Sequence, residues 1–221
     1  MTTRVLSLSA ALLFVTLVAS ACNVSVSFGD GIEGSGVVVT ESFDLGGFDE
    51  IRVSSAFEVD VEVGPEVSVV VRADDNLIEH LEVEVDDDRL RLGLDESLRN
   101  GTLEATVTLP SLRGVDISGA SEVTIIGIDA ADLDVEISGA SEVTASGQAA
   151  ALRLDASGAS DVRFETLVVD TARVDISGAS DIDLSNASMV RGDLSGASDL
   201  TVSEDADASV DTSGASTLNR S

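Results

Sequence analysis

Apolar and acidic residues alternate with period two through the second half of the chain, around a tetrapeptide Ser-Gly-Ala-Ser that occurs six times. The residue before each tetrapeptide and the residue two places earlier are mostly apolar. The residue between them is acidic in every copy: Asp116, Glu136, Asp155, Asp175, Asp193 and Asp211. Because successive side chains of a strand point to opposite faces, this pattern predicts a strand with one buried face and one acidic face.

A second alternating stretch follows each of the first five tetrapeptides. Its outward positions are again acidic: Glu122, Glu142, Asp161, Asp181 and Asp199. The residues directly after them are apolar: Val123, Val143, Val162, Ile182 and Leu200. Each repeat is therefore predicted to consist of a strand, a corner, a second strand and a looser return.

The spacing of the tetrapeptides predicts the fold class. They lie at 118–121, 138–141, 157–160, 177–180, 195–198 and 213–216, at intervals of 20, 19, 20, 18 and 18 residues. Repeats of this length indicate a solenoid, and the connections are too short for helical crossovers. We predict an all-β fold, a right-handed parallel β-helix or β-roll-like solenoid with about 18–20 residues per turn.

The tetrapeptides are predicted to be structural corners. Glycine permits positive φ, and alanine and serine are small enough to stack where the coil bends. The six predicted structural turn positions are Gly119, Gly139, Gly158, Gly178, Gly196 and Gly214. The serine hydroxyls are expected to bond to the local backbone or to neighbouring turns. A nucleophilic serine needs a base within reach, and the single histidine, His80, lies outside the repeats.

The first half of the chain is less regular and contains further predicted strands joined by Asp-rich and Gly-rich turns. The stretch VSSAFEVDV at 53–61 aligns with ISGASEVTI at 117–125, at an offset of 64 residues, or about three of the later turns. We therefore predict one β-helical domain over 34–221, with a larger cross-section in its first half. Two domains that meet near Pro110 are the alternative.

The N-terminus has the pattern of an export signal. One arginine precedes an apolar run that ends in small residues before Cys22, the only cysteine. This end resembles a bacterial lipobox, although Ala19 stands where leucine is usual. We predict a lipoprotein-type signal peptide over 1–21, lipidation of Cys22, and a short linker over 22–33. An ordinary secreted protein with a free thiol is the alternative.

The charge restricts the partners. Without the predicted signal, 11 basic residues stand against 41 acidic ones, a net charge of −30. Nucleic acid is excluded as a partner because its phosphates need the opposite sign. Such a field favours cations and basic surfaces.

Carboxylates that repeat at the strand spacing of about 4.8 Å repel one another by about 1 kcal/mol per pair even in water. Arg153, Arg173 and Arg191 each stand two residues before an acidic position and are predicted to relieve the first series. The second series has only Arg163 beside it. The hypothesis there is Ca²⁺ bound by Glu122, Glu142, Asp161, Asp181 and Asp199, and the alternative is a solvated face. No other cofactor is expected.

Three stretches in order, GSGVVVTESFDLGGFDEIRVSSAFEVDV, VRADDNLIEHLEVEVDDDRLRL and VTLPSLRGVDISGASEVT, precede the repeats. Together with the repeats, they resemble the auto-transporter adhesin head domain family, also called the GIN domain, over about 34–218. The resemblance implies an exported bacterial protein, often a lipoprotein, with a β-helix-like fold. It implies no catalytic residues.

We therefore expect a non-enzymatic protein of the cell envelope, anchored to the membrane by its lipid and facing the extracytoplasmic side. It would act as an adhesin or scaffold that presents acidic β-faces to a protein or glycan surface. The alternatives are an envelope-stress accessory or sensory lipoprotein and a polysaccharide-active enzyme, which needs two carboxyl groups in distinct environments. An uncapped end of the coil adds self-association into a homo-oligomer as a hypothesis.

Overall fold

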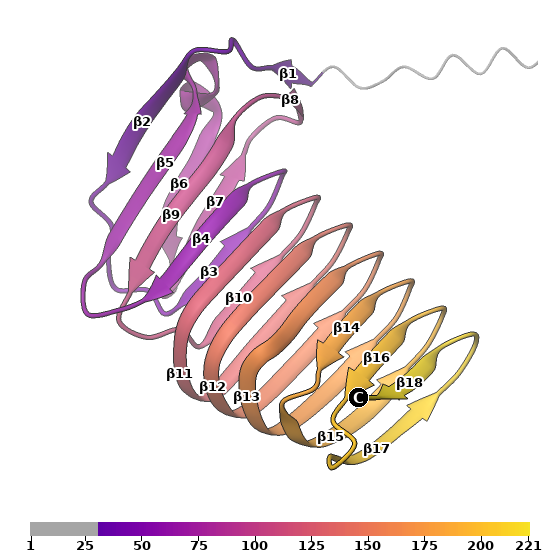
Figure 1. Cartoon of the computed structure of the whole chain (residues 1–221). Coiled ribbons are helices and arrows are strands. Elements are labelled where there is room, and N and C mark those ends of the chain that lie inside the picture. Colours follow the sequence, from indigo (N-terminus) through magenta and orange to yellow (C-terminus); the bar gives the residue numbers. More distant parts are fainter. Residues whose placement is uncertain (1–30) are drawn as a thin grey trace, which may run out of the picture. The chain divides into compact units, whose positions relative to one another are not determined.

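The computed structural model describes residues 31–221. The predicted signal peptide, Cys22 and the linker residues up to 30 lie outside the described residues. The described part contains 18 strands and one short 3-10 helix. Figure 1 shows its repeats as a series of stacked coils.

The repeats form strands that pair in parallel with their counterparts one coil further along, so the predicted parallel β-solenoid is confirmed. These strands are β10 (Gly114–Ile117), β11 (Glu122–Ile137), β12 (Glu142–Ala156), β13 (Asp161–Ile176), β14 (Asp181–Leu184), β15 (Ala187–Leu194), β16 (Asp199–Val202), β17 (Asp207–Thr212) and β18 (Thr217–Arg220).

Each coil contributes one segment to each of two sheets. Sheet 1 contains the segments that precede the tetrapeptides, and sheet 2 contains those that follow them. β11, β12 and β13 are long enough to pass through both sheets, so the predicted looser return is a bend within a continuous strand in these coils. Gly127 and Gly147 lie at two of these bends, with φ of 79° and 126°.

The core lies between the two sheets and is made of stacked apolar columns. Ile117, Ile137, Ala156 and Ile176 follow one another on sheet 1, and each is at most 2% exposed. The residues after the acidic positions of sheet 2 are equally buried: Val123, Val143, Val162, Ile182 and Leu200. The predicted alternation of apolar inward and acidic outward positions is therefore confirmed in register.

The corners continue the hydrogen-bond ladder from one coil to the next. The Ala140 N–H donates to the carbonyl of Gly119 at 2.8 Å, and the same bond recurs at the following corners. The six tetrapeptide glycines have φ between 75° and 97°, and a Cβ on Gly139 would lie 2.2 Å from the Gly119 oxygen. Glycine is required here both by its φ and by this close approach.

The first coil aligns with the repeats as the sequence indicates, although the offset was interpreted wrongly. β4 (Glu58–Val63) lies directly beside β11, with Val59 opposite Val123. The 64 residues therefore separate neighbouring strands and do not span three turns. The physical reason is that residues 64–113 leave the coil after β4 and return at β10.

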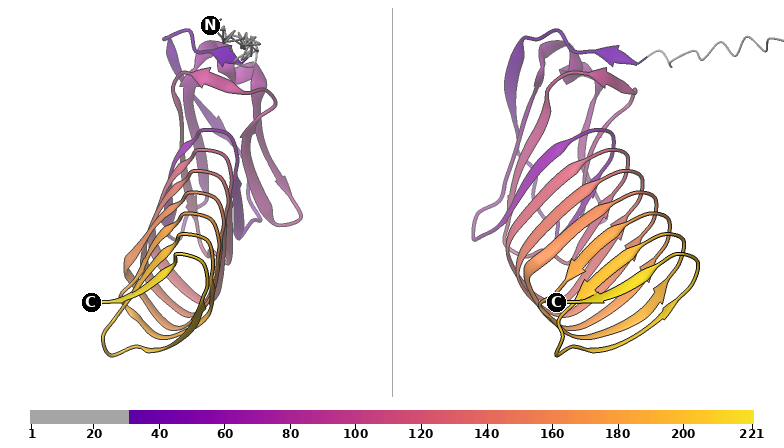
Figure 2. Two further views of the ribbon diagram at one scale, coloured as in Figure 1. Left: turned by 90° about the vertical axis from the view of Figure 1, so that its right-hand side faces the viewer. Right: turned by 45° about the vertical axis from the view of Figure 1, so that its right-hand side comes forward.

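The segment 64–113, together with β2, extends both sheets at the N-terminal end, as Figure 2 shows from two further sides. On sheet 1, β7 pairs in parallel with β3 and antiparallel with β6. On sheet 2, β9 pairs in parallel with β4, β5 pairs antiparallel with β9, and β2 pairs antiparallel with β5. The bounds are β2 (Val38–Phe43), β3 (Glu50–Val53), β5 (Ser68–Asp74), β6 (Leu81–Asp86), β7 (Arg89–Leu94), β8 (Leu98–Asn100) and β9 (Leu103–Leu109).

Two elements differ from the sequence-based expectation. The 3-10 helix η1 (Asp75–His80) forms where only strands and turns were predicted. β1 (Ile32–Glu33) pairs with β8, so ordered structure begins inside the range assigned to a linker. The buried carboxylate of Asp74 secures this region, since it accepts the N–H of Gly36 at 2.9 Å and of Thr102 at 2.8 Å.

Replacing a corner glycine should destabilise the coil. Gly158→Ala would force a φ of 97° on alanine and place its Cβ 2.2 Å from the Gly139 oxygen. We expect a loss of about 3 kcal/mol in the free energy of unfolding, measured by denaturant titration. Gly46→Ala is the matched control, because its Cβ meets nothing closer than Val67 at 4.0 Å. Equal stability of the two variants would contradict this account of the corners.

Candidate functional site

The outward carboxylates of sheet 1 form a continuous line, here named column 1. Strand register places the six acidic residues on successive coils: Asp116, Glu136, Asp155, Asp175, Asp193 and Asp211. Arg52 precedes them in the same register and lies 3.4 Å from Asp116. Because one repeat of the sequence forms one coil, acidic residues at the repeat period lie side by side as a line of like charges.

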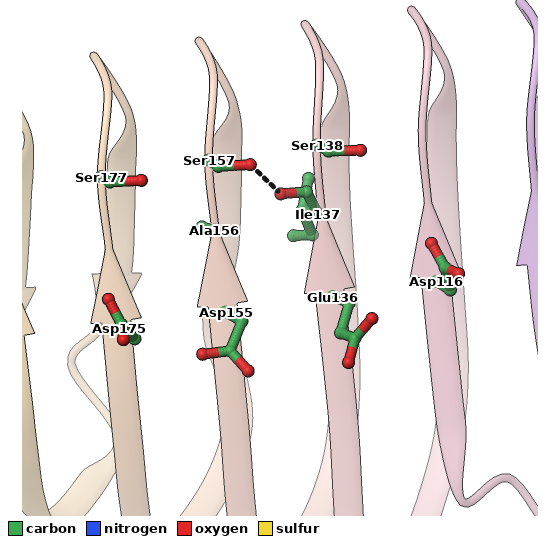
Figure 3. Close-up of a pocket in the computed structure, with 9 residues that line it drawn as sticks. All are labelled: Asp116, Glu136, Ile137, Ser138, Asp155, Ala156, Ser157, Asp175 and Ser177. Carbon is green, nitrogen blue, oxygen red and sulfur yellow. Dashed lines mark hydrogen bonds between the residues drawn. The ribbon is translucent and has the colours of Figure 1, made fainter.

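Column 1 borders a shallow groove of about 290 Å³, shown in Figure 3. Its polar lining consists of four carboxylates and three serines: Asp116, Glu136, Asp155, Asp175, Ser138, Ser157 and Ser177. The Ser138 and Ser157 hydroxyls donate to backbone carbonyls of the preceding coil at 3.5 and 3.4 Å. Both contacts are long for hydrogen bonds between oxygens, so the four carboxylates set the chemistry of the groove as a hydrogen-bond acceptor.

A second hollow, of about 210 Å³, continues the groove toward the N-terminal end and shares Asp116 and Glu136 with it. The hollow forms because Gly114, two residues before Asp116 on the same strand, has no side chain. Glu50 is held there by Arg89 at 2.7 Å and Arg113 at 3.1 Å. The hydrogen bond to Glu50 raises the pKa of Arg89.

The predicted relief of column 1 by arginines is correct in one coil. Arg153 lies 2.6 Å from Asp155, and this hydrogen bond raises the pKa of Arg153. Arg191 instead pairs with Asp207 of the next coil at 2.8 Å and thereby lowers the pKa of that carboxyl group. Arg173 has no carboxylate within 4 Å among residues 31–221. The prediction was wrong for Arg191 because its partner lies on the next coil, and no ion pair of Arg173 within the described residues relieves column 1.

The carboxylates of sheet 2 form a second line, named column 2. It contains the five residues predicted to bind metal, on successive coils: Glu122, Glu142, Asp161, Asp181 and Asp199. Glu58 and Glu104 extend it toward the N-terminal end. The alignment of 53–61 with 117–125 could reveal Glu58, but Glu104 enters only through the pairing of β9 with β4.

The middle of column 2 is bridged by an arginine. Arg163 bonds to Glu142 and lies 2.6 Å from Asp161, and the hydrogen bond to Glu142 is the main reason that its pKa is raised. Within residues 31–221 there is no group of three or more His, Cys, Asp or Glu side chains arranged to hold a metal ion. Ca²⁺ takes six to eight oxygen ligands, whereas each coil adds one carboxylate to the column. Calcium binding by column 2 therefore stays one of two hypotheses, the other being a solvated face.

His80, the single histidine of the sequence, lies outside both columns. Its ring is partly buried, with Nδ1 2.9 Å from Asp95. Of the helices in the described range, none has the length and apolarity required to cross a bilayer.

The fold and the columns define a repeat protein of the β-solenoid class. Residues 47–206, more than half of the chain, match the family model described as "Putative auto-transporter adhesin, head GIN domain". The chain therefore belongs to this family. The resemblance inferred from the sequence is confirmed.

Solved structures share the fold. A "putative adhesin" from Bacteroides fragilis has 18% sequence identity and a TM-score of 0.66, covering 86% of this chain and 100% of its own. A "Putative lipid binding protein" from Parabacteroides distasonis has 16% identity and a TM-score of 0.52, covering 86% and 99%. No match is found among curated proteins. At these identities the likeness concerns the fold alone.

The calcium hypothesis is tested by thermal unfolding of the chain in CaCl₂ and in NaCl at equal ionic strength. Because Arg163 already neutralises the centre of column 2, we expect both salts to raise the midpoint equally, through screening of the columns. A rise specific to Ca²⁺ and reversed by a chelator would establish metal sites.

Removing the bridging arginine should weaken column 2. Arg163→Gln leaves Glu142 and Asp161 facing each other without a cation, and both side chains are almost half exposed. We expect a small loss in unfolding free energy at low salt, which disappears at high salt because the pair is exposed and screened. Arg173→Gln is the control with the same charge change and no ion pair within the described residues. An equal effect of both variants would contradict a specific role for the bridge.

Proposed function

We propose that the protein is a non-enzymatic, adhesin-like module whose column 1 groove binds a cationic surface of a partner protein. The observation that carries this proposal is the chemistry of the groove. Its four carboxylates, when ionised, only accept hydrogen bonds. A partner that supplies charged donors, as lysine and arginine side chains do, therefore fits the groove best.

The electrostatics of the groove favour the same class of partner. Glu136 and Asp175 have no basic group within 4 Å among residues 31–221, while Asp116 and Asp155 each have one. Uncompensated charges held on a rigid sheet repel one another, and a cation that binds between them relieves the repulsion. The field of a strongly acidic protein also speeds the approach of a basic partner.

The family supports the adhesin-like role. The family model and the Bacteroides fragilis relative are both described as adhesins, and such a protein acts at an exposed surface. Export by the signal peptide at 1–21 and anchoring through lipidated Cys22 complete the proposal, since they would hold the solenoid at the envelope. A repetitive sheet also suits binding through many weak contacts, because each coil adds an equivalent one.

The proposal is tested by binding of the chain to a film of polylysine, with a film of polyglutamate as the negative surface. The variant Glu136→Gln/Asp175→Asn removes the two uncompensated groove carboxylates. We expect it to weaken binding about ten-fold, which corresponds to about 1.4 kcal/mol. Binding of the unaltered chain should weaken steeply with salt.

The matched control is Asp87→Asn/Asp88→Asn, which removes the same charge from an exposed turn. Both residues have positive φ, which asparagine tolerates. If this control weakened binding as much as the groove variant, binding would follow net charge alone and the groove would not be the site. The same pair of variants, displayed on cells, extends the comparison to adhesion on basic protein surfaces.

A further inference from the structure

Among residues 31–221, the outermost strand of sheet 2 at the N-terminal end, β2, is paired with another strand on one edge only. β5 pairs with it antiparallel, with Val38 opposite Asp74 and Phe43 opposite Val69. Figures 1 and 2 show no other strand of the described residues beside it. One row of its backbone groups is therefore available to another strand.

The register identifies these groups. The Asp75 N–H donates to the Val37 carbonyl at 2.8 Å, so residue 37 faces β5. Because the bonding direction alternates along an antiparallel strand, residues 39 and 41 face β5 as well. Val38, Thr40 and Ser42 thus direct their N–H and C=O groups to the free edge.

The face of β2 that continues the core is also uncovered. On β5, Val71 and Ala73 are fully buried. Their partners on the same face of β2 are Glu41 and Val39, and both are exposed. Three consecutive valines are exposed here, Val37 at 57%, Val38 at 41% and Val39 at 36%, and contiguous exposed apolar residues of this kind mark interaction surfaces.

Charge distinguishes β2 from the other free edge at this end. β6, the outermost strand of sheet 1, carries Glu82, Glu84 and Asp86, and acidic edges of this kind repel a second copy. β2 carries one charged residue, Glu41. In a chain with such a large net negative charge, a second copy can approach most closely where carboxylates are few.

We propose that β2 pairs antiparallel with β2 of a second copy of the chain, about a two-fold axis at Thr40. In this register Val38 of each copy lies opposite Ser42 of the other, and Val37 lies opposite Phe43. Glu41 lies opposite Val39. Centring the pair at Glu41 would place two carboxylates directly opposite each other, which is unfavourable. The dimer leaves column 1 free, because column 1 lies on sheet 1.

The register is tested by disulfide trapping in the full chain carrying Cys22→Ser, so that only the introduced thiols react. Residues 39 and 41 form a non-hydrogen-bonded pair, whose Cα atoms lie about 4.5 Å apart, within the range of a disulfide. Two copies of residue 39, or two of residue 41, lie on a diagonal at about 7–8 Å. We expect a covalent dimer when Val39→Cys and Glu41→Cys are mixed and oxidised, and its loss when either is oxidised alone.

The edge itself is tested by Thr40→Pro, with the mass measured by sedimentation equilibrium. The Thr40 N–H does not bond to β5, so proline removes a donor only from the free edge. We expect the unaltered chain to have twice the mass of one chain and the variant to have the mass of one. An unchanged thermal midpoint at low protein concentration shows that the variant is folded.

Several results would overturn the proposal. The first is that the unaltered chain is a monomer and that no covalent dimer forms when the Val39→Cys and Glu41→Cys chains are mixed. The second is that either cysteine variant oxidised alone gives as much covalent dimer as the mixture. The third is that the Thr40→Pro chain still has twice the mass of one chain. A monomer in which the amides of Val38, Thr40 and Ser42 resist hydrogen exchange would also overturn it, because the edge would then be covered by the chain itself.

Discussion

The structure depends on the hydrogen bond that joins each corner to the one before it. The alanine N–H of one tetrapeptide donates to the glycine carbonyl of the preceding coil, at 2.7–2.8 Å from Ala140 onward. This bond draws the corners so close that no Cβ fits between them. The constraint explains why the glycine recurs in every tetrapeptide while the strands around it vary, and it keeps every coil in register with the next.

Register has an electrostatic cost. Once the corners are fixed, equivalent side chains stack at the strand spacing, so acidic positions become columns of like charge. Apolar columns on the opposite face, such as that of Val123, Val143 and Val162, stabilise the same stacking. The coil tolerates its carboxylates because the buried columns and the ladder outweigh a repulsion that solvent and salt screen. The same repulsion leaves the surface ready to bind cations.

The regular repeats end in the N-terminal region. There the antiparallel strands β2, β5 and β6 replace the repeats, so the sheets terminate in edges that differ in charge. The acidic edge of β6 discourages pairing, whereas β2 has few charges and exposed valines. A dimer through β2 would present two groove surfaces at once, which strengthens attachment to a surface without any new contact.

The sequence by itself determined the solenoid, the inward and outward positions and the membership of both columns within the repeats, because a fixed period repeats the same local environment in each coil. It could not place Glu104, which reaches column 2 through β9, nor the pairing of Arg191 with Asp207, which joins different coils. Nor could it show that 64 residues separate neighbouring strands or that β2 has one unpaired edge within residues 31–221. Only the tertiary structure decided these features, because they depend on long-range pairings that have no period in the chain.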